Sequence, residues 1–246
     1  MKKIISLLFA AVPILASAQT GTFTINSKVG EYNAPAKAYL IYSGGATNIT
    51  DSVVLKNGTF QFSGKISDPV RATLVLDTKG TGLGTLRRQR NADALALYLE
   101  QGTITLTSPD SVYKAKITGS KINADNARLQ ESLKEVGAKF EALNREFTAA
   151  PVQQQQQPEF RKGFQDRAEV LEKEHREVLK QFIQQNRSSA VSLDALKTYG
   201  GYFPEASEVE PLFNALDASI RSTAAGKAYA EVVKKARVTA LGAQAP

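Results

Sequence analysis

The stretch DSVVLKNGTFQFSGKI, residues 51–66, decides how the first half of the chain folds. Asn57-Gly58 lies between two apolar runs, and this dipeptide favours the positive backbone dihedral angles of a type I′ hairpin turn. Phe60 and Phe62 alternate with polar residues, which is the period of a strand with one buried face. The stretch therefore predicts two antiparallel strands joined by a tight turn.

Similar short segments lie on both sides of this stretch, and they are rich in β-branched and aromatic residues. They are TFTINSKV and AKAYLIY before it, and RATLVLD, ALALYLE, GTITLTS and YKAKITG after it. Turn signals separate them every several residues, which is typical of all-β folds. Residues 22–118 therefore predict an antiparallel β-sandwich or a barrel-like sheet of seven or eight strands.

The period changes to that of a helix over residues 123–149. Apolar residues there follow a spacing of 4, 3, 4, 3, 4, close to a heptad seam: Leu129, Leu133, Val136, Phe140, Leu143 and Phe147. The segment PVQQQQQP at 151–158 predicts a loop between helices. A second stripe follows it: Phe160, Phe164, Ala168, Leu171, His175, Val178 and Phe182. The two helices are expected to form an antiparallel hairpin, with charged residues such as EKEHRE facing water.

The rest of the chain also has helical spacing. Ser189 predicts an N-cap, Val209, Leu212, Phe213 and Leu216 predict one apolar face, and Tyr229, Val232, Val233 and Ala236 predict another. The fold class is therefore α+β. We expect an all-β domain at 19–120, an α-helical domain at 121–241, and the start of a linker at 242–246.

The first 18 residues have the three parts of a secretory signal peptide: two lysines, an apolar run and an Ala-x-Ala site ending at Ala18. We expect cleavage after Ala18 and a non-lipidated periplasmic protein with no membrane span. The chain has a formal charge of +7, and losing Lys2 and Lys3 lowers it to +5. This modest excess and its one short basic cluster do not suggest a nucleic-acid partner.

Catalytic motifs are not evident in the sequence. The chain has no Cys, which excludes thiol redox chemistry, thiolate catalysis and disulfides within it. The single histidine, His175, lies on an apolar stripe without a second His or a nucleophile placed by sequence, so we interpret it as a hydrogen-bonded histidine at the helix seam or its edge rather than a general base. The carboxylates show no metal-binding spacing; Glu172, Glu174 and Glu177 belong to a charged helix face. We expect no catalytic residue, cofactor or metal site.

The segment GTGLG at 80–84 has strands predicted on both sides, unlike a dinucleotide fingerprint. We interpret it as a flexible hairpin loop that presents Arg87, Arg88 and Arg90. The functional interpretation of these arginines is contact with an anion or a partner. The simpler interpretation, which we favour, is a solvated basic loop.

The order of segments resembles a known family. A signal peptide leads to GTFQFSGKISDPVRATLVL, then LYLEQGTITLTS, then ITGSKINADNARL, and finally GKAYAEVVKKARVTALGAQAP. This resembles the N-terminal portion of the TlpA-like (AhpC/TSA-like) thiol-disulfide oxidoreductases of Bacteroidetes-type bacteria. The resemblance implies a β domain of unknown function and a helical region that precede a thioredoxin-like domain. No residue here matches that domain's Cys-x-x-Cys pair, so no catalytic residue is transferred.

Three functions are compatible with these observations. The first is a non-catalytic periplasmic binding or scaffolding module with a protein partner, in which homo-oligomerisation through the helical stripes is an option. The second is a fragment of a thiol-disulfide oxidoreductase whose thioredoxin-like domain is missing. The third is a carbohydrate-binding or hydrolytic β domain, for which we expect Tyr42 to be an exposed aromatic contact.

Overall fold

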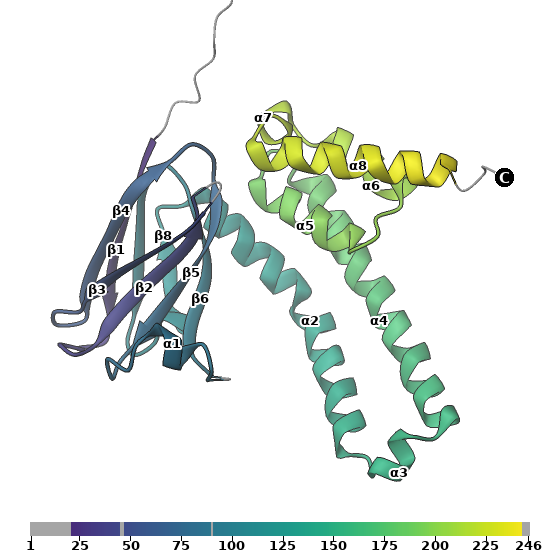
Figure 1. The fold of residues 1–246 in the computed structure, drawn as a ribbon, viewed down its shortest axis with the longest axis horizontal. Helices are drawn as coiled ribbons and strands as arrows, with labels where there is room; N and C mark the ends of the chain where they lie inside the picture. Colours follow the sequence, from purple (N-terminus) through teal and green to yellow (C-terminus); the bar gives the residue numbers. More distant parts are fainter. Residues whose placement is uncertain (1–20, 45–46, 90, 243–246) are drawn as a thin grey trace, which may run out of the picture.

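The computed structural model describes residues 21–44, 47–89 and 91–242. A β-sandwich forms the first part of the chain and a helical region the second, which confirms the α+β class (Figure 1). The expected signal peptide, Arg90 and residues 243–246 of the expected linker lie outside the described residues. Gly242, expected in that linker, is instead the last residue of the final helix.

Two four-stranded sheets form the sandwich. Sheet I has the order β4-β1-β7-β8, with β4 (Thr59–Ile66), β1 (Gly21–Val29), β7 (Gly102–Ser108) and β8 (Lys116–Thr118). Sheet II has the order β3-β2-β5-β6, with β3 (Asn48–Val54), β2 (Lys37–Ser43), β5 (Val70–Asp77) and β6 (Asp93–Leu99). Neighbouring strands are antiparallel except β1 and β7, which are parallel. The sandwich prediction is therefore confirmed, with one parallel pair that the sequence did not predict.

The alternating residues of the strands form the core between the sheets. In β1, Phe23, Ile25 and Val29 point inward and are almost fully buried. Phe60 and Phe62 of β4 do the same, as their spacing predicts. Tyr42 is only 8% exposed and lies edge-on to Phe23 in this core, so its expected role as an exposed aromatic contact is wrong.

The Asn57-Gly58 turn is present, but the strands beside it do not form a hairpin ladder. Asn57 and Gly58 both have positive φ, and Lys56 and Thr59 exchange backbone hydrogen bonds of 3.1 and 2.9 Å. Beyond this bridge the chain separates, because β3 pairs with β2 in sheet II and β4 with β1 in sheet I. The turn is thus confirmed, whereas the predicted pairing of its two strands is wrong: the turn carries the chain from one sheet to the other.

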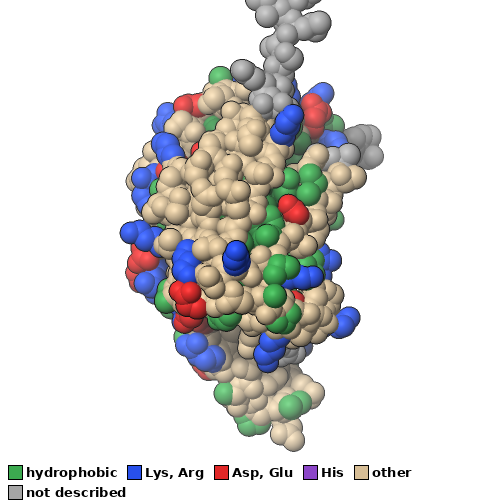
Figure 2. All heavy atoms as spheres, turned by 90° about the vertical axis from the view of Figure 1, so that its left-hand side faces the viewer, with side chains coloured by type: hydrophobic (Ala, Val, Ile, Leu, Met, Phe, Trp, Pro, Cys, Tyr) green, Lys and Arg blue, Asp and Glu red, His purple; other side chains and the backbone are tan. Residues whose placement is uncertain are grey.

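The outer faces of the two sheets have different chemistry. Sheet I turns hydroxyl, amide and lysine side chains outward: Thr22, Thr24, Asn26, Lys28, Thr59, Gln61, Ser63, Lys65, Thr103, Thr105, Thr107, Lys116 and Thr118. Figure 2 looks toward this side of the sandwich and shows a broad tan area with few charged side chains in it. On sheet II, by contrast, Tyr98 of β6 belongs to the core of the helical region. Sheet II therefore joins the sandwich to the helical core through Tyr98, while β8 of sheet I contacts α2 (Lys121–Ala149), into which it leads.

Two short helical segments interrupt the strands, namely α1 (Leu83–Leu86) and the 3₁₀ helix η1 (Val112–Lys114). The predicted helical hairpin is present as α2 (Lys121–Ala149) and α4 (Pro158–Gln185), which run side by side away from the sandwich (Figure 1). The glutamine-rich segment between them is not entirely loop, since it contains the one-turn helix α3 (Val152–Gln155). None of the described helices combines the length and the apolar character needed to cross a membrane.

Four further helices pack around the base of this hairpin: α5 (Ala190–Gly200), α6 (Ala206–Ala215), α7 (Ala218–Arg221) and α8 (Ala224–Gly242). Ser189 caps α5 as predicted, because its hydroxyl accepts a hydrogen bond from the Val191 N–H. Tyr229 and Val233 of α8 are buried in the helical core. Val232 is 39% exposed, so its predicted inward position is wrong. Adjacent residues on a helix point about 100° apart, and the core contacts only the Val233 side.

Candidate functional site

A cleft of about 990 Å³ lies where one end of the sandwich meets the helical region. The sandwich contributes the turn between β4 and β5 and the end of β6, and the helices contribute the start of α2 and residues near the N-terminal ends of α5 and α8. Its lining includes the apolar side chains of Ile49, Ile66, Val70, Ile122, Leu193 and Ile220. Because both parts of the chain line it, its shape depends on how firmly they are joined.

The main joint is a pair of hydrogen bonds between β6 and α2. The side-chain amide of Asn123 accepts from the Tyr98 backbone N–H and donates to the Tyr98 carbonyl, both at 2.8 Å. The amide thus occupies the place of a neighbouring strand at the edge of sheet II. Asn123 is only 5% exposed, so these backbone groups are satisfied away from water. The first turn of α2 is therefore fixed to the sheet.

The Tyr98 side chain forms a second joint, to α5. Its hydroxyl donates a 2.7 Å hydrogen bond to Asp194, which also pairs with Lys197 at 2.8 Å. Burial, and then the Asp194 carboxylate, raise the pKa of the Tyr98 phenol well above its ordinary value, while Arg71 acts in the opposite direction. The phenol therefore stays protonated at neutral pH and remains a donor to Asp194.

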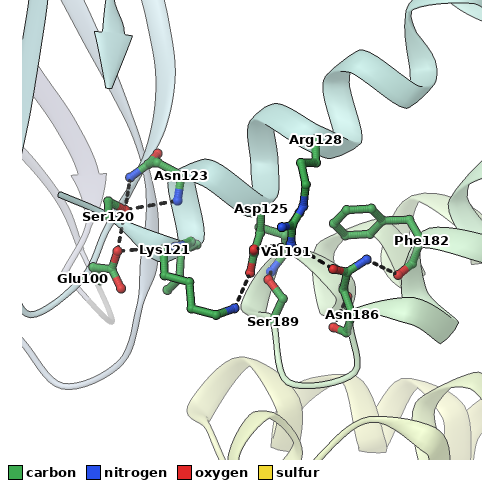
Figure 3. Close-up of polar contacts among 12 residues, drawn as sticks. Glu100, Ser120, Lys121, Asn123, Asp125, Arg128, Phe182, Asn186, Ser189 and Val191 are labelled. Atoms are coloured by element: carbon green, nitrogen blue, oxygen red, sulfur yellow. Dashed lines mark hydrogen bonds and ion pairs between the residues drawn. The ribbon is translucent and has the colours of Figure 1, made fainter. Parts of the chain in front are cut away.

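Two more carboxylates of the cleft organise the beginning of α2 (Figure 3). Glu100 accepts from the hydroxyl of Ser120, the N-cap residue of α2. Asp125 is buried, with its side chain 2% exposed, and it pairs with Lys121 at 3.0 Å and Arg128 at 2.6 Å. A buried carboxylate needs such partners, because its desolvation is otherwise costly.

The remaining carboxylate of the cleft, Asp68, joins the sandwich to α8. Its Oδ2 accepts a 3.0 Å hydrogen bond from the backbone N–H of Ala224, the first residue of that helix. A negative charge is favourable there, because the N-terminal end of a helix carries unpaired N–H groups and a positive partial charge. The cleft is thus closed at this side by a contact between residues far apart in the sequence.

The arginines singled out in the sequence lie elsewhere. Arg87 and Arg88 follow α1 and are exposed. They come after the far end of β5, whereas the cleft lies at the beginning of that strand, so the structure does not bring them into the cleft. Their exposure is compatible with both interpretations, a partner contact and a solvated loop.

The loop before these arginines, which we expected to be a flexible hairpin loop, connects β5 and β6 and is anchored by hydrogen bonds to Asp77. The Asp77 carboxylate accepts hydrogen bonds from the backbone N–H groups of Gly82, Thr81 and Lys79, at 2.7, 3.1 and 3.3 Å. Burial by itself raises the pKa of Asp77, but the backbone donors outweigh it and hold this pKa below its ordinary value. The carboxylate therefore stays charged and anchors the loop.

His175 lies at the contact between α2 and α4, and its ring is edge-on to Phe140 with centroids 6.4 Å apart. Glu174 pairs across the same contact with Lys139 of α2, at 2.6 Å. Arg176, expected to face water within EKEHRE, instead pairs with Glu208 of α6 and lies over the ring of Tyr199 at 4.4 Å. These contacts hold helices together. Within the described part of the chain, no group of three or more His, Cys, Asp or Glu side chains could hold a metal ion.

Comparison with protein families identifies the first part of the chain. Residues 23–126 match a family model described as a domain of unknown function, DUF4369. A DUF4369 domain is therefore present here. The match covers the sandwich after the first residues of β1 and ends within α2, so it includes both Tyr98 and Asn123. No curated protein and no solved structure matched the chain.

Sequence reasoning missed the residues that build the cleft. Ser120 offered a local signal, because a serine before an apolar periodic segment is a typical N-cap. We placed the start of the helical period at residue 123, two residues after α2 begins at Lys121, and so missed Ser120 as its N-cap. Tyr98 and Asp194 had no such signal, because they are 96 residues apart and meet only in the folded DUF4369 domain and its adjoining helices.

Proposed function

We propose that this chain is a non-catalytic periplasmic binding or scaffolding module, and that the cleft binds a protein partner. The observation that carries the proposal is a cleft of about 990 Å³ whose two sides are joined by buried hydrogen bonds. This volume lies at the upper end of the range of about 300–1,000 Å³ for ligand pockets. A site with fixed walls loses little conformational entropy on binding.

The side chains of the cleft support binding rather than catalysis. All four of its carboxylates accept hydrogen bonds from protein donors: Asp68, Glu100 and Asp194 from donors in other segments, and Asp125 from donors within α2. The chain has no Cys, and its one histidine lies in the helical hairpin. A nucleophile activated by a neighbouring base, which covalent catalysis requires, is therefore not apparent in the cleft.

Site-specific photo-crosslinking in the cell envelope tests this proposal. Ile49 lines the cleft and is 37% exposed, so a photo-crosslinking amino acid is expected to be tolerated there. The matched control position is Thr103, which is exposed on the outer face of sheet I. We expect an adduct of one defined mass from position 49 and not from position 103. We also expect the identified partner to bind the purified chain, and more weakly after Ile49→Trp fills part of the cleft.

The proposal fails if neither position gives an adduct or if both give the same set. It also fails if the purified chain turns over a substrate at the cleft, since the module is proposed to be non-catalytic.

A second candidate is the front part of a periplasmic thiol-disulfide oxidoreductase. The DUF4369 domain followed by helices favours it, because the family that the sequence resembles has a β domain and a helical region before its thioredoxin-like domain. The intact mass of the native product, detected with an antibody to the helical region, separates the two candidates. A mass equal to residues 19–246 supports the module alone. A markedly larger mass and reaction with thiol reagents support the oxidoreductase.

For the carbohydrate-binding or hydrolytic alternative, the exposed contact that we expected at Tyr42 is wrong. Tyr42 is buried between the sheets, where a glycan cannot reach it. Burial also raises its pKa, with a smaller contribution from Asp51.

A further inference from the structure

The charged side chains of the cleft differ in how they are paired. Four acidic and four basic residues line it. The carboxylates all accept hydrogen bonds from the protein, and Lys121 and Lys197 pair with Asp125 and Asp194. The other two cations, Lys65 and Arg71, form no ion pair or hydrogen bond with any described residue. These two cations are therefore available to a ligand at this end of the cleft.

These two cations lie at the two ends of one turn. Lys65 is near the end of β4, Arg71 is the second residue of β5, and both are exposed. Arg71 is paired in register with Tyr98 across β5 and β6, which places it beside the joint described above. An arginine guanidinium offers several N–H donors in a planar fork that matches a carboxylate.

Apolar side chains lie in the same cleft. Ile122 is the second residue of α2, Ile220 belongs to α7, and Ile49 lies on the exposed edge strand β3. A ligand that satisfies the whole site must therefore combine an anionic group with apolar groups beside it. A peptide segment in which Glu or Asp alternates with aliphatic residues has this chemistry, and it can contact both parts of the chain that line the cleft.

We propose that the cleft binds an acidic peptide segment of a protein partner, with a carboxylate at Lys65 and Arg71 and aliphatic side chains against Ile49, Ile122 and Ile220. This inference rests on the proposed function and adds the chemistry of the ligand. A basic peptide is disfavoured, because the Asp68 and Glu100 carboxylates already accept hydrogen bonds from the backbone of α8 and the N-cap of α2, whereas Lys65 and Arg71 would repel its charges.

The test uses two fluorescein-labelled peptides of alternating residues with amidated C-termini, one of Leu and Glu and one of Leu and Gln. Fluorescence polarisation is measured with the full chain lacking residues 1–18. We expect the Glu peptide to bind at least about tenfold more tightly than the Gln peptide, because hydrogen bonds between charged groups are stronger than those to a neutral amide. Raising the salt concentration is expected to reduce this preference.

Variants locate the site. Lys65→Ala combined with Arg71→Ala is expected to remove the preference for the Glu peptide. The control combines Lys56→Ala with Lys116→Ala, which removes the same charge from exposed positions of the sandwich outside the cleft lining and is expected to keep the preference. Ile49→Glu adds a negative charge at an exposed cleft position and is expected to weaken the Glu peptide more than the Gln peptide. Circular dichroism confirms that each variant is folded.

Equal affinity for the two peptides, no binding of either, or a preference that survives the Lys65 and Arg71 changes overturns the inference. The crosslinking experiment then shows which proposal has failed. If the partner adduct from position 49 is unchanged in the Lys65 and Arg71 variant, the ligand chemistry is wrong and the binding function stands. If the native chain gives no adduct, the binding function itself is wrong.

Discussion

The two ends of the α2–α4 hairpin share one sequence pattern but have different surroundings. We call the end beside β6 and α5 the root and the end beside α3 the tip. At the root, Leu179, Phe182 and Ile183 are 1%, 6% and 0% exposed and belong to the helical core. At the tip, Phe147 and Phe164 are half-buried, and the Phe147 ring lies against the rings of Phe164 and Phe160, with centroids 4.7 and 5.8 Å away. A heptad-like stripe therefore specifies which face two helices share, whereas the neighbouring elements decide how deeply it is buried.

The polar contacts differ in the same way. The root holds the buried Asn123 amide and the buried Asp125 carboxylate. At the tip, Arg167 and Glu146 form a two-bond ion pair at 2.7 and 2.6 Å, with both side chains 54% exposed. Buried hydrogen bonds are costly to break, while exposed ion pairs contribute little. We therefore expect the root to determine the stability of the helical region and the tip to tolerate change.

The largest effect is expected from the same substitution made at both ends. Phe182→Ala at the root removes a buried ring and is expected to lower the free energy of unfolding by about 3–5 kcal/mol. Phe164→Ala at the tip removes the same group from a half-buried position, and we expect about half that loss or less. Urea unfolding followed by circular dichroism measures both values. Equal losses at the two positions would show that the tip is as well packed as the root.

A smaller loss is expected from Asn123→Ala, which leaves the Tyr98 backbone N–H and carbonyl without their partner. Unsatisfied buried groups cost about 1–3 kcal/mol each, and we expect a total loss of about 2–3 kcal/mol. Asn144→Ala, at an exposed position of the same helix nearer the tip, is the control and is expected to change stability by less than about 0.5 kcal/mol. Hydrogen exchange at the Tyr98 amide is expected to speed up only in the first variant.

The comparison also shows what the sequence could predict. Helix faces and strand alternation were predictable, because they depend on residues three to four or two positions apart. Leu129, Phe182, Phe60 and Phe62 lie inside as their spacing indicates. The assignment of β3 and β4 to different sheets was not predictable from the Asn57-Gly58 turn, because pairing is decided by strands distant in the sequence.

The candidate site was not predictable at all from local pattern. Its joints connect Tyr98 with Asp194 and Asp68 with Ala224, and each partner looks ordinary in its own segment. Arg87 and Arg88 attracted attention because they are adjacent and basic, but they lie at the other end of the sandwich. A cluster of adjacent charged residues can indicate only a site that lies within one loop. This cleft is lined by residues from both sheets and from four helices, which are distant in the sequence.

A pH-dependent effect is expected at the root from Tyr98→Phe. At neutral pH the loss of the hydrogen bond to Asp194 is expected to cost about 1–2 kcal/mol. The pKa of the Tyr98 phenol is raised in the folded protein, and this determines how the stability changes at alkaline pH. Above about pH 10 the unfolded chain releases the Tyr98 proton while the folded chain keeps it, so the native protein loses stability as the pH rises. The variant has no such proton to release.

The stability difference between the native protein and Tyr98→Phe is therefore expected to shrink between about pH 10 and 11. Tyr229 is present in both proteins, and its pKa, raised by burial to about 12, contributes equally to both. Urea unfolding at pH 7, 9, 10 and 11 measures the difference. A difference that stays constant over this range would mean that the Tyr98 phenol is not held in its protonated form by the fold.

The smallest effect is expected at the tip, from Arg167→Ala. Removing this partner of Glu146 is expected to change the free energy of unfolding very little, because both side chains are largely solvated and the side-chain entropy regained offsets part of the lost attraction. High salt is expected to reduce even this difference, since exposed charges are screened within about 10 Å at 0.1 M. Glu146→Gln serves as the matched change on the other partner. A loss as large as that of Asn123→Ala that persists in high salt would mean that the tip depends on this ion pair as the root depends on Asn123.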